Sequence, residues 1–244
     1  MTRKFETEKE IVFETTADGS LTLYVPNLDE HYHSMNGAVQ ESQHVYLDAG
    51  LLHYIQNNGN IPPTGIQMLE FGFGTGLNAF LTALEAEKQK VKIHYTALEK
   101  YPLSPEITTQ LNYSTANQSL FQNIHQSGWG SPISITPYFT LQKLAIDFAL
   151  FDYPSCYDVV YYDAFAPDKQ PEAWSQELFD KLFSSMNPKG VLTTYCAKGS
   201  IRRMMQQAGF FVERIPGAAG KREMLRANVL DKPDYDKEKN EYQQ

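Results

Sequence analysis

The spacing of apolar and polar positions changes near residue 66. From there to residue 229, short runs rich in Val, Ile, Tyr and Thr alternate with stretches of helical character. Near-continuous apolar runs separated by helices are typical of a parallel sheet that is covered on both faces. The pattern therefore predicts an α/β fold with strands over residues 66–71, 91–99, 133–139, 157–165, 190–196, 209–215 and 222–229.

The end of this pattern narrows the choice of fold. The segment from residue 177 reads as a helix that Pro188 and Gly190 stop ahead of the next strand. Only residues 216–221, PGAAGK, separate the last two predicted strands. Because this connection is too short for a crossover helix, the two strands must pair antiparallel. A mostly parallel sheet with an antiparallel last strand is similar to the Rossmann-like sheet of class I methyltransferases.

The N-terminal part follows a different pattern. Residues 11–25 alternate on both sides of Asp18-Gly19, a strong signal for a two-stranded hairpin, and the second half of residues 29–55 reads as a helix. We therefore expect residues 1–60 to form a small extension, packed on a core domain of residues 61–230. The first ten residues are polar and expected to fray. The charged tail, residues 231–244, is expected to be disordered.

Composition indicates where the protein works. The 244 residues carry a formal net charge of −8, and no apolar run is long enough to span a membrane. The N-terminus lacks the apolar stretch of a signal peptide, so we expect a cytoplasmic protein. The acidic balance argues against a protein that coats nucleic acid indiscriminately. Cys156 and Cys196 fall before and within predicted strands, so we expect inert core thiols.

One region departs from the acidic average. Residues 198–226 contain seven basic and two acidic residues. A solvated charged face and a contact surface for phosphate explain such a cluster equally well. Arg202 and Arg203 fall on the helix predicted after residue 196, and Lys221 and Arg222 begin the last predicted strand.

A glycine-rich loop carries the first chemical signal. LEFGFGTGLNAF, residues 69–80, places Gly72, Gly74 and Gly76 between a predicted strand and a predicted helix. The lysine and hydroxyl of a GxxxxGK[ST] phosphate loop are missing. The spacing does fit the G-x-G-x-x-A fingerprint, and Glu99 follows about 20 residues later, where a carboxylate accepts ribose hydroxyls. The loop predicts an adenosine-containing ligand, unless the glycines only permit a tight turn.

Glu70 bears on which adenosine ligand is bound. It lies two residues before Gly72 and gives the motif E-x-G-x-G-x-G. A dinucleotide brings a negative pyrophosphate to such a loop, whereas S-adenosylmethionine brings a sulfonium and an ammonium. Because a carboxylate tolerates cations and repels pyrophosphate, the motif favours S-adenosylmethionine. An NAD-dependent oxidoreductase that uses Gly74, Gly76 and Glu99 stays open as the alternative.

A second group of residues follows the fourth predicted strand. Asp163 falls at its carboxyl end, where open α/β sheets bind ligands, and Pro167 cannot continue the ladder. An aspartate there can take a proton from an amine or orient its lone pair. Phe165 can stack on a base or lie near a sulfonium. The group suits methyl transfer to an amine, and an aspartate that only caps the loop is the alternative.

Other chemistries find little support in the chain. His31 and His33 share a face if their segment is extended, but no acidic or cysteine partner falls at ligand spacing, so no metal is expected. No serine lies in a G-x-S-x-G elbow, so hydrolysis through a serine nucleophile is not indicated.

Four segments together resemble a known family. EFGFGTGLNAF, YYDAFAPDKQPEAWSQELF, CAKGSIRRMMQQAGFFVER and GKREML are similar, in this order, to the methyltransferase domain of the bacterial tRNA 5-methylaminomethyl-2-thiouridine methyltransferases. The similarity includes HYHSMNGAVQESQHVYL and covers most of the chain. It implies methyl transfer from S-adenosylmethionine to the amine of 5-aminomethyl-uridine, or its 2-thio form, at the tRNA wobble position.

The resemblance also implies a partner enzyme. In this family the domain is often fused to a flavin-dependent oxidase that exposes the amine. The chain has no second nucleotide-binding glycine fingerprint, so we expect a stand-alone methyltransferase that receives its amine from a separate enzyme.

Carried over by position, the resemblance gives roles to individual residues. Asp163 becomes the catalytic or amine-orienting carboxylate, and residues 34–41 reach over the methionine end of the cofactor. Thr140 aligns where related methyltransferases present an acidic residue to adenine. The cofactor site would consist of Glu70, Gly72, Gly74, Gly76, Asn78 and Glu99.

The resemblance also implies a function for the basic residues between 198 and 226. Arg202, Arg203, Lys221 and Arg222 would hold tRNA phosphates beside the mouth of the site, and Phe165 would meet the flipped wobble base. Two further functions stay open: a methyltransferase for a small amine, and an RNA-binding module without catalysis.

Overall fold

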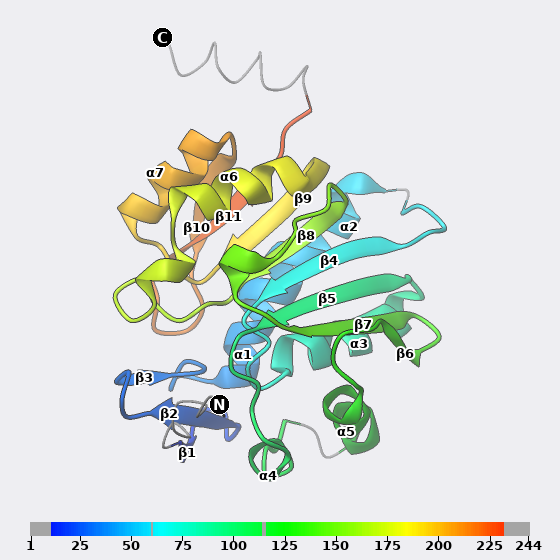
Figure 1. Cartoon of the computed structure of the whole chain (residues 1–244), viewed down its shortest axis with the longest axis vertical. Helices are drawn as coiled ribbons and strands as arrows, with labels where there is room; N and C mark the ends of the chain where they lie inside the picture. The colour runs from blue at the N-terminus through cyan, green and yellow to red at the C-terminus, as the bar shows by residue number, and fades with distance from the viewer. Residues whose placement is uncertain (1–10, 60, 114–115, 232–244) are drawn as a thin grey trace, which may run out of the picture.

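A computed structural model describes residues 11–59, 61–113 and 116–231 (Figure 1). Its strands are β1 (Val12–Thr15), β2 (Leu21–Val25), β3 (Glu30–His31), β4 (Ile66–Phe71), β5 (Ile93–Glu99), β6 (Ile133–Thr136), β7 (Phe139–Ala145), β8 (Tyr157–Tyr162), β9 (Met186–Thr194), β10 (Phe211–Pro216) and β11 (Glu223–Asn228). Its main helices are α1 (Ala38–Ser42), the π-helix η1 (Gln43–Leu52), α2 (His53–Asn58), α3 (Leu77–Gln89), α4 (Pro105–Thr108), α5 (Gln118–Gln126), α6 (Gln176–Ser185) and α7 (Gly199–Ala208).

The central sheet has the order β10-β11-β9-β8-β4-β5-β7-β6. Strands β9, β8, β4, β5 and β7 run parallel, whereas β11 pairs antiparallel with both β9 and β10. The prediction of a Rossmann-like, mostly parallel sheet with an antiparallel last strand is therefore confirmed. The order places the carboxyl ends of β4, β5 and β8 side by side, which is where open α/β sheets bind ligands.

Successive side chains of the buried strands pack alternately into two hydrophobic cores, one on each face of the sheet. Along β4, Ile66 and Met68 enter one cluster with α3 and η1, whereas Leu69 and Phe71 enter another with α6 and α7. Figure 1 shows these helices on opposite sides of the sheet. Residues 66, 68 and 70 share a face because side chains alternate along a strand. Glu70 therefore points towards α3 and η1.

The N-terminal residues form the predicted hairpin. The Asp18 carboxylate accepts the Ser20 N–H at 3.0 Å and closes the turn between β1 and β2. A third strand, β3, which the pattern did not predict, pairs antiparallel with β2. The boundaries of the two proposed domains, at residues 60 and 230, stay predictions.

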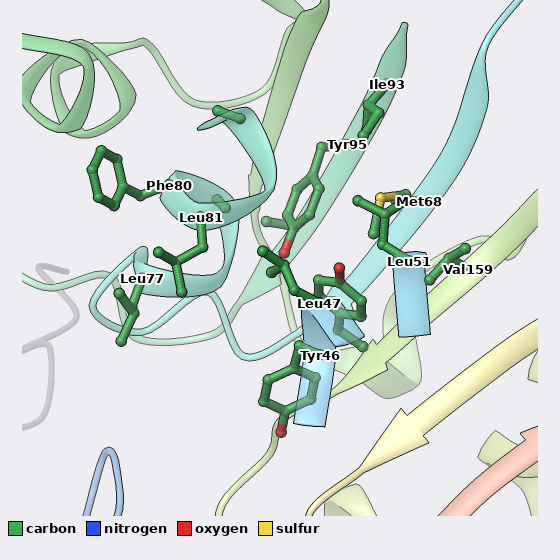
Figure 2. Packing of buried hydrophobic residues seen from close by; sticks show 14 of the residues in the cluster. Tyr46, Leu47, Leu51, Met68, Leu77, Phe80, Leu81, Ile93, Tyr95 and Val159 are labelled. Atoms are coloured by element: carbon green, nitrogen blue, oxygen red, sulfur yellow. The ribbon is translucent and has the colours of Figure 1, made fainter. Parts of the chain in front are cut away.

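The helix predicted after this sheet runs through α1, η1 and α2 and packs directly on the central sheet. Gly50 makes this possible, because a Cβ there would lie 3.0 Å from the Tyr161 ring. Figure 2 shows Leu47 and Leu51 facing the strands that carry Met68 and Val159. One face of the sheet is thus covered by a chain segment that precedes it.

Three predicted boundaries are wrong. The stretch 133–139 is not one strand but β6 and the start of β7, which pair antiparallel with a register shift between Ser134 and Thr136. The helix α6 ends at Ser185, and Pro188 lies inside β9, where the register against β8 is irregular. Cys196 is a buried free thiol just after β9 rather than within a strand.

Predictions for the first ten residues and for residues 232–244 lie outside the described part of the chain. No helix within the described ranges is long and apolar enough to cross a membrane.

Candidate active site

The glycine loop turns directly under the end of β8. Gly72 has φ +85°, and a Cβ there would lie 2.7 Å from the backbone oxygen of Asp163. Only glycine allows both this conformation and this approach. Gly76, the N-cap residue of α3, ends the loop. The turn therefore brings the N-terminus of α3 and Asp163 to the same place.

A cavity of about 460 Å³ opens at this point. The carboxyl ends of β4, β5 and β8 form its floor, and residues 28–35 of the N-terminal extension form one wall. Of the residues predicted for the site, it is lined by Gly72, Gly74, Asn78, Glu99, Asp163, Phe165 and Lys221.

Glu99 is held against the glycine loop. Its Oε2 accepts the N–H of Gly74 at 3.0 Å, and its Oε1 accepts the N–H of Tyr101 at 2.8 Å. Because Glu99 is the last residue of β5, its carboxylate projects into the cavity from the strand end. This geometry fits a carboxylate that accepts ribose hydroxyls.

Asp163 lies deep in the cavity and both of its oxygens accept hydrogen bonds. The Tyr46 hydroxyl donates to Oδ1 at 2.5 Å, and the Asn78 amide donates to Oδ2 at 2.8 Å. Burial raises the pKa of Asp163 from 3.8 to about 7, and the negative charge of Glu41 adds to this, although the Tyr46 and Asn78 donors act in the opposite direction. The carboxyl can therefore change its protonation state near neutral pH.

Glu70 is placed differently from the prediction. It is fully buried and lies behind the cavity rather than among the residues that line it. Its Oε1 accepts the Asn78 amide at 3.0 Å, and burial together with the nearby Asp163 raises its pKa well above the usual value. Because burial favours the neutral acid, the structure does not support repulsion of pyrophosphate by a negative Glu70 at the loop.

The walls of the cavity supply the acidic character that Glu70 does not. Five carboxyl residues line it: Glu30, Glu41, Glu99, Asp163 and Glu172. Three lysines also line it, but each is in an ion pair with a carboxylate: Lys100 with Asp147, Lys169 with Asp29 and Lys221 with Glu41. Such a surface favours a cationic ligand over a pyrophosphate.

Adenine recognition needs a second correction. Thr140 is the second residue of β7 and pairs with His94 near the start of β5, so it lies at the wrong end of the sheet. The acidic residue just beyond the carboxyl end of β7 is Asp147, which bonds to Lys100 at 2.8 Å. Phe148 follows it and lines the cavity. The misplacement came from assigning residues 133–139 to the third parallel strand.

Several residues of the site gave no sequence signal of their own. Tyr46 lies in the middle of a predicted helix, and Tyr32 packs edge-on against Phe165 with ring centroids 5.0 Å apart. The predicted segment 34–41 does reach the cavity through Ser34, Met35 and Glu41. Tyr46 and Asp163 are more than a hundred residues apart in the sequence, so only the folded structure shows that they are in contact.

The basic residues predicted to bind tRNA differ in whether they are already paired with a carboxylate. Lys221 and Arg222 precede β11 rather than beginning it. The Lys221 ammonium bonds to Glu41 at 2.7 Å, so it is not free for phosphate. Arg203 and Arg222 are exposed and Arg202 is half-buried. Within the described ranges, none of these three arginines is in an ion pair. Arg202 and Arg203 lie in the first half of α7, which begins just after the carboxyl end of β9.

The cavity fits S-adenosylmethionine by its donor set. The N-terminus of α3 suits a carboxylate, Glu99 suits ribose hydroxyls, and the acidic walls suit the two cationic groups. Among the described residues, no group of three or more His, Cys, Asp or Glu side chains is arranged to hold a metal ion.

Comparison with known proteins supports the same ligand. Residues 138–229 match a family described as S-adenosyl-L-methionine-dependent methyltransferase. This part of the chain is therefore similar to the S-adenosyl-L-methionine-dependent methyltransferases. The similarity supports S-adenosylmethionine as the cofactor and argues against a nicotinamide dinucleotide.

Relatives extend the match towards the N-terminus. The chain is 28% identical over 229 residues to the tRNA 5-methylaminomethyl-2-thiouridine biosynthesis bifunctional protein MnmC of Leptospira borgpetersenii, covering 89% of this chain and 35% of the relative. It is 32% identical over 222 residues to the protein of the same name in Pseudomonas fluorescens, covering 84% of this chain and 33% of the relative. The predicted resemblance is confirmed, and the chain spans about a third of the length of these relatives.

Solved structures show the same fold. MnmC2 from Aquifex aeolicus superposes with a TM-score of 0.76 at 22% identity, covering 96% of this chain and 76% of that chain. Spermidine synthase from Thermotoga maritima superposes with a TM-score of 0.50 at 10% identity, covering 92% and 82%.

Proposed function

We propose that this methyltransferase transfers a methyl group to the primary amine of 5-aminomethyl-uridine, or its 2-thio form, at the tRNA wobble position. Relatives whose names specify 5-methylaminomethyl-2-thiouridine biosynthesis support the substrate class. The observation that carries the chemistry is Asp163, a carboxyl with both oxygens held and a pKa near neutrality at the floor of the cavity.

The lining residues would hold the cofactor in a defined direction. Glu99 would bind the ribose, and the loop from Gly72 to Gly76 would bind the methionine end. Phe148 and Asp147 follow β7 on the side where the adenine would lie. The bound cofactor supplies an electrophilic methyl group on a sulfonium.

Asp163 would prepare the attacking nitrogen. An alkyl ammonium has no free lone pair, so it must lose a proton before it can attack a methyl carbon. A carboxylate whose pKa lies near the working pH accepts that proton efficiently. Because Tyr46 and Asn78 fix both oxygens, the carboxylate also holds the amine in one orientation.

The tRNA would lie across the mouth of the cavity. Arg202, Arg203 and Arg222 would contact its phosphates, and Phe165 would meet the wobble base from the cavity wall. Since the whole protein has a net charge of −8, binding is expected to weaken steeply with salt.

The substrate requires an earlier reaction. Another enzyme must expose the primary amine on the modified uridine before this methyltransferase can act. We further propose that both steps take place in the cytoplasm, where tRNA is modified.

The test compares tRNA nucleosides from a strain that lacks this protein with those from the parent strain. Mass spectrometry should find aminomethyl-uridine accumulated in the former, because the amine is made but not methylated. Re-expression of the wild-type chain should remove it, and re-expression of Asp163→Asn should not. An unchanged nucleoside profile in the deletion strain would refute the proposed substrate.

A further inference from the structure

The buried neighbours of Asp163 form a continuous chain of hydrogen bonds. The amide nitrogen of Asn78 donates to Asp163 Oδ2 at 2.8 Å and to Glu70 Oε1 at 3.0 Å. Both hydrogens of one amide group are thus shared between two carboxyl groups. Glu70 is fully buried and Asn78 is 2% exposed, so the orientation of Asn78 is fixed by its partners rather than by water.

The surroundings of Glu70 hold no positive charge to balance an ionised carboxylate. Within the described ranges Glu70 is in no ion pair, and its Oε2 is buried without a hydrogen-bond partner. Besides the Asn78 amide, the groups that act on its pKa include the carboxyl of Asp163, which raises it, and the phenol of Tyr95. An isolated ionised carboxylate in such a place is strongly destabilising, and a second one across a single amide adds repulsion.

We propose that Glu70 carries a proton and acts through Asn78 as a positioning residue for Asp163, without touching the cofactor. A neutral Glu70 accepts the Asn78 amide with its carbonyl oxygen and so holds the other amide hydrogen on Asp163. The glutamate of the E-x-G-x-G-x-G motif then serves the acceptor side of the reaction. This inference rests on the proposed role of Asp163.

An ionised Glu70 that binds the cofactor would give a different result on substitution. If Glu70 were ionised and bound the cofactor's ammonium, removal of its charge would weaken cofactor binding. Loss of a hydrogen bond to a charged group costs about tenfold or more in affinity. Glutamine has the shape of a protonated glutamate and no charge, so Glu70→Gln separates the two arrangements.

The first measurement is calorimetric titration of the full chain with S-adenosylhomocysteine, the demethylated cofactor, which retains the ammonium. For Glu70→Gln we expect an affinity within about twofold of wild type, since the amide preserves the acceptor for Asn78. The matched control is Glu85→Gln, a buried glutamate of α3 that binds Lys88 away from the cavity. A tenfold weaker affinity for Glu70→Gln alone would overturn the proposal.

The second measurement is steady-state kinetics on aminomethyl-tRNA. Glu70→Leu removes the acceptor for Asn78 but keeps most of the volume, so kcat should fall about tenfold or more while the KM for the cofactor changes less than about threefold. Glu70→Gln should retain the wild-type kcat. An unchanged kcat in Glu70→Leu would refute the positioning role. If the wild type does not methylate the tRNA, the proposed function fails, while the titration still reports whether Glu70 is charged.

Discussion

Asp163 should make the stability of the protein depend on pH in an unusual direction. Its pKa is about 7 in the folded protein, compared with the ordinary value of 3.8 that applies to the unfolded chain. The folded state therefore holds the proton more tightly, so the stability linked to this group is lost as pH rises from about 4 to about 7. Each unit of pH crossed between these values changes the free energy of unfolding by about 1.4 kcal/mol.

Asp163→Asn removes the titration and keeps the shape. Between pH 5 and pH 8 the pH crosses about two units of this window, so the wild type should lose about 2.7 kcal/mol of stability relative to Asp163→Asn. Titrating groups that do not interact with Asp163 cancel in the difference. Asp18→Asn is the matched control, because hydrogen bonds from Ser20 and Thr16 help to lower the pKa of Asp18 to about 2, and Asp18 stays ionised throughout this range.

The assay is urea unfolding of the three proteins, followed by circular dichroism at pH 5, 6, 7 and 8. The difference between wild type and Asp163→Asn should change steadily up to about pH 7 and then level off. The difference between wild type and Asp18→Asn should stay constant. A constant difference for Asp163→Asn would show that Asp163 is an ordinary surface-like carboxylate, and the argument for a base tuned to neutral pH would fail.

Three further predictions concern ligand and RNA binding. Gly72→Ala should destabilise the protein by about 2 kcal/mol or more and abolish S-adenosylhomocysteine binding, because φ is +85° and the new Cβ would lie 2.7 Å from the Asp163 backbone oxygen. Thermal unfolding measures the stability and calorimetry measures the binding. A variant that is as stable as wild type and still binds would contradict the prediction. Calorimetry should detect S-adenosylhomocysteine and not NAD, since the cavity walls are acidic; comparable affinities would contradict the assignment. The double variant Arg202→Ala/Arg203→Ala should bind tRNA more weakly. The slope of the logarithm of the tRNA association constant against the logarithm of salt concentration should flatten by about one for each phosphate that the variant no longer neutralises. An unaltered slope would show that these arginines do not contact tRNA phosphates.

The sheet was predictable because strands that are buried on both faces have nearly continuous apolar sequences. Strands β4, β5 and β8 appear as apolar runs, and the short connection before β11 alone requires an antiparallel pair. The hairpin of β6 and β7 was missed because two half-exposed strands meet at a short turn that reads as one alternating run. This single error placed Thr140, rather than Asp147, just beyond the carboxyl end of the third parallel strand.

The composition of the site was predictable, but the charge state of its residues was not. Glycine spacing, Glu99 and Asp163 all follow from positions at strand ends, so the sequence places them correctly. Burial depth and partners are properties of the folded chain. Burial raises the pKa of Glu70 well above its usual value, and Lys221 is paired with Glu41 rather than free. Tyr46 enters the site only because η1 packs under β8.

The most direct test of the account is a methyl-transfer assay with the purified chain. The protein would be incubated with S-adenosylmethionine labelled on the methyl group and tRNA bearing 5-aminomethyl-uridine, and the nucleosides would be analysed by mass spectrometry. We predict one labelled methyl on the aminomethyl nitrogen with wild type, and none with Asp163→Asn, although that variant still binds S-adenosylhomocysteine. Absence of the labelled nucleoside with a cofactor-binding wild type would refute the proposed methyl transfer.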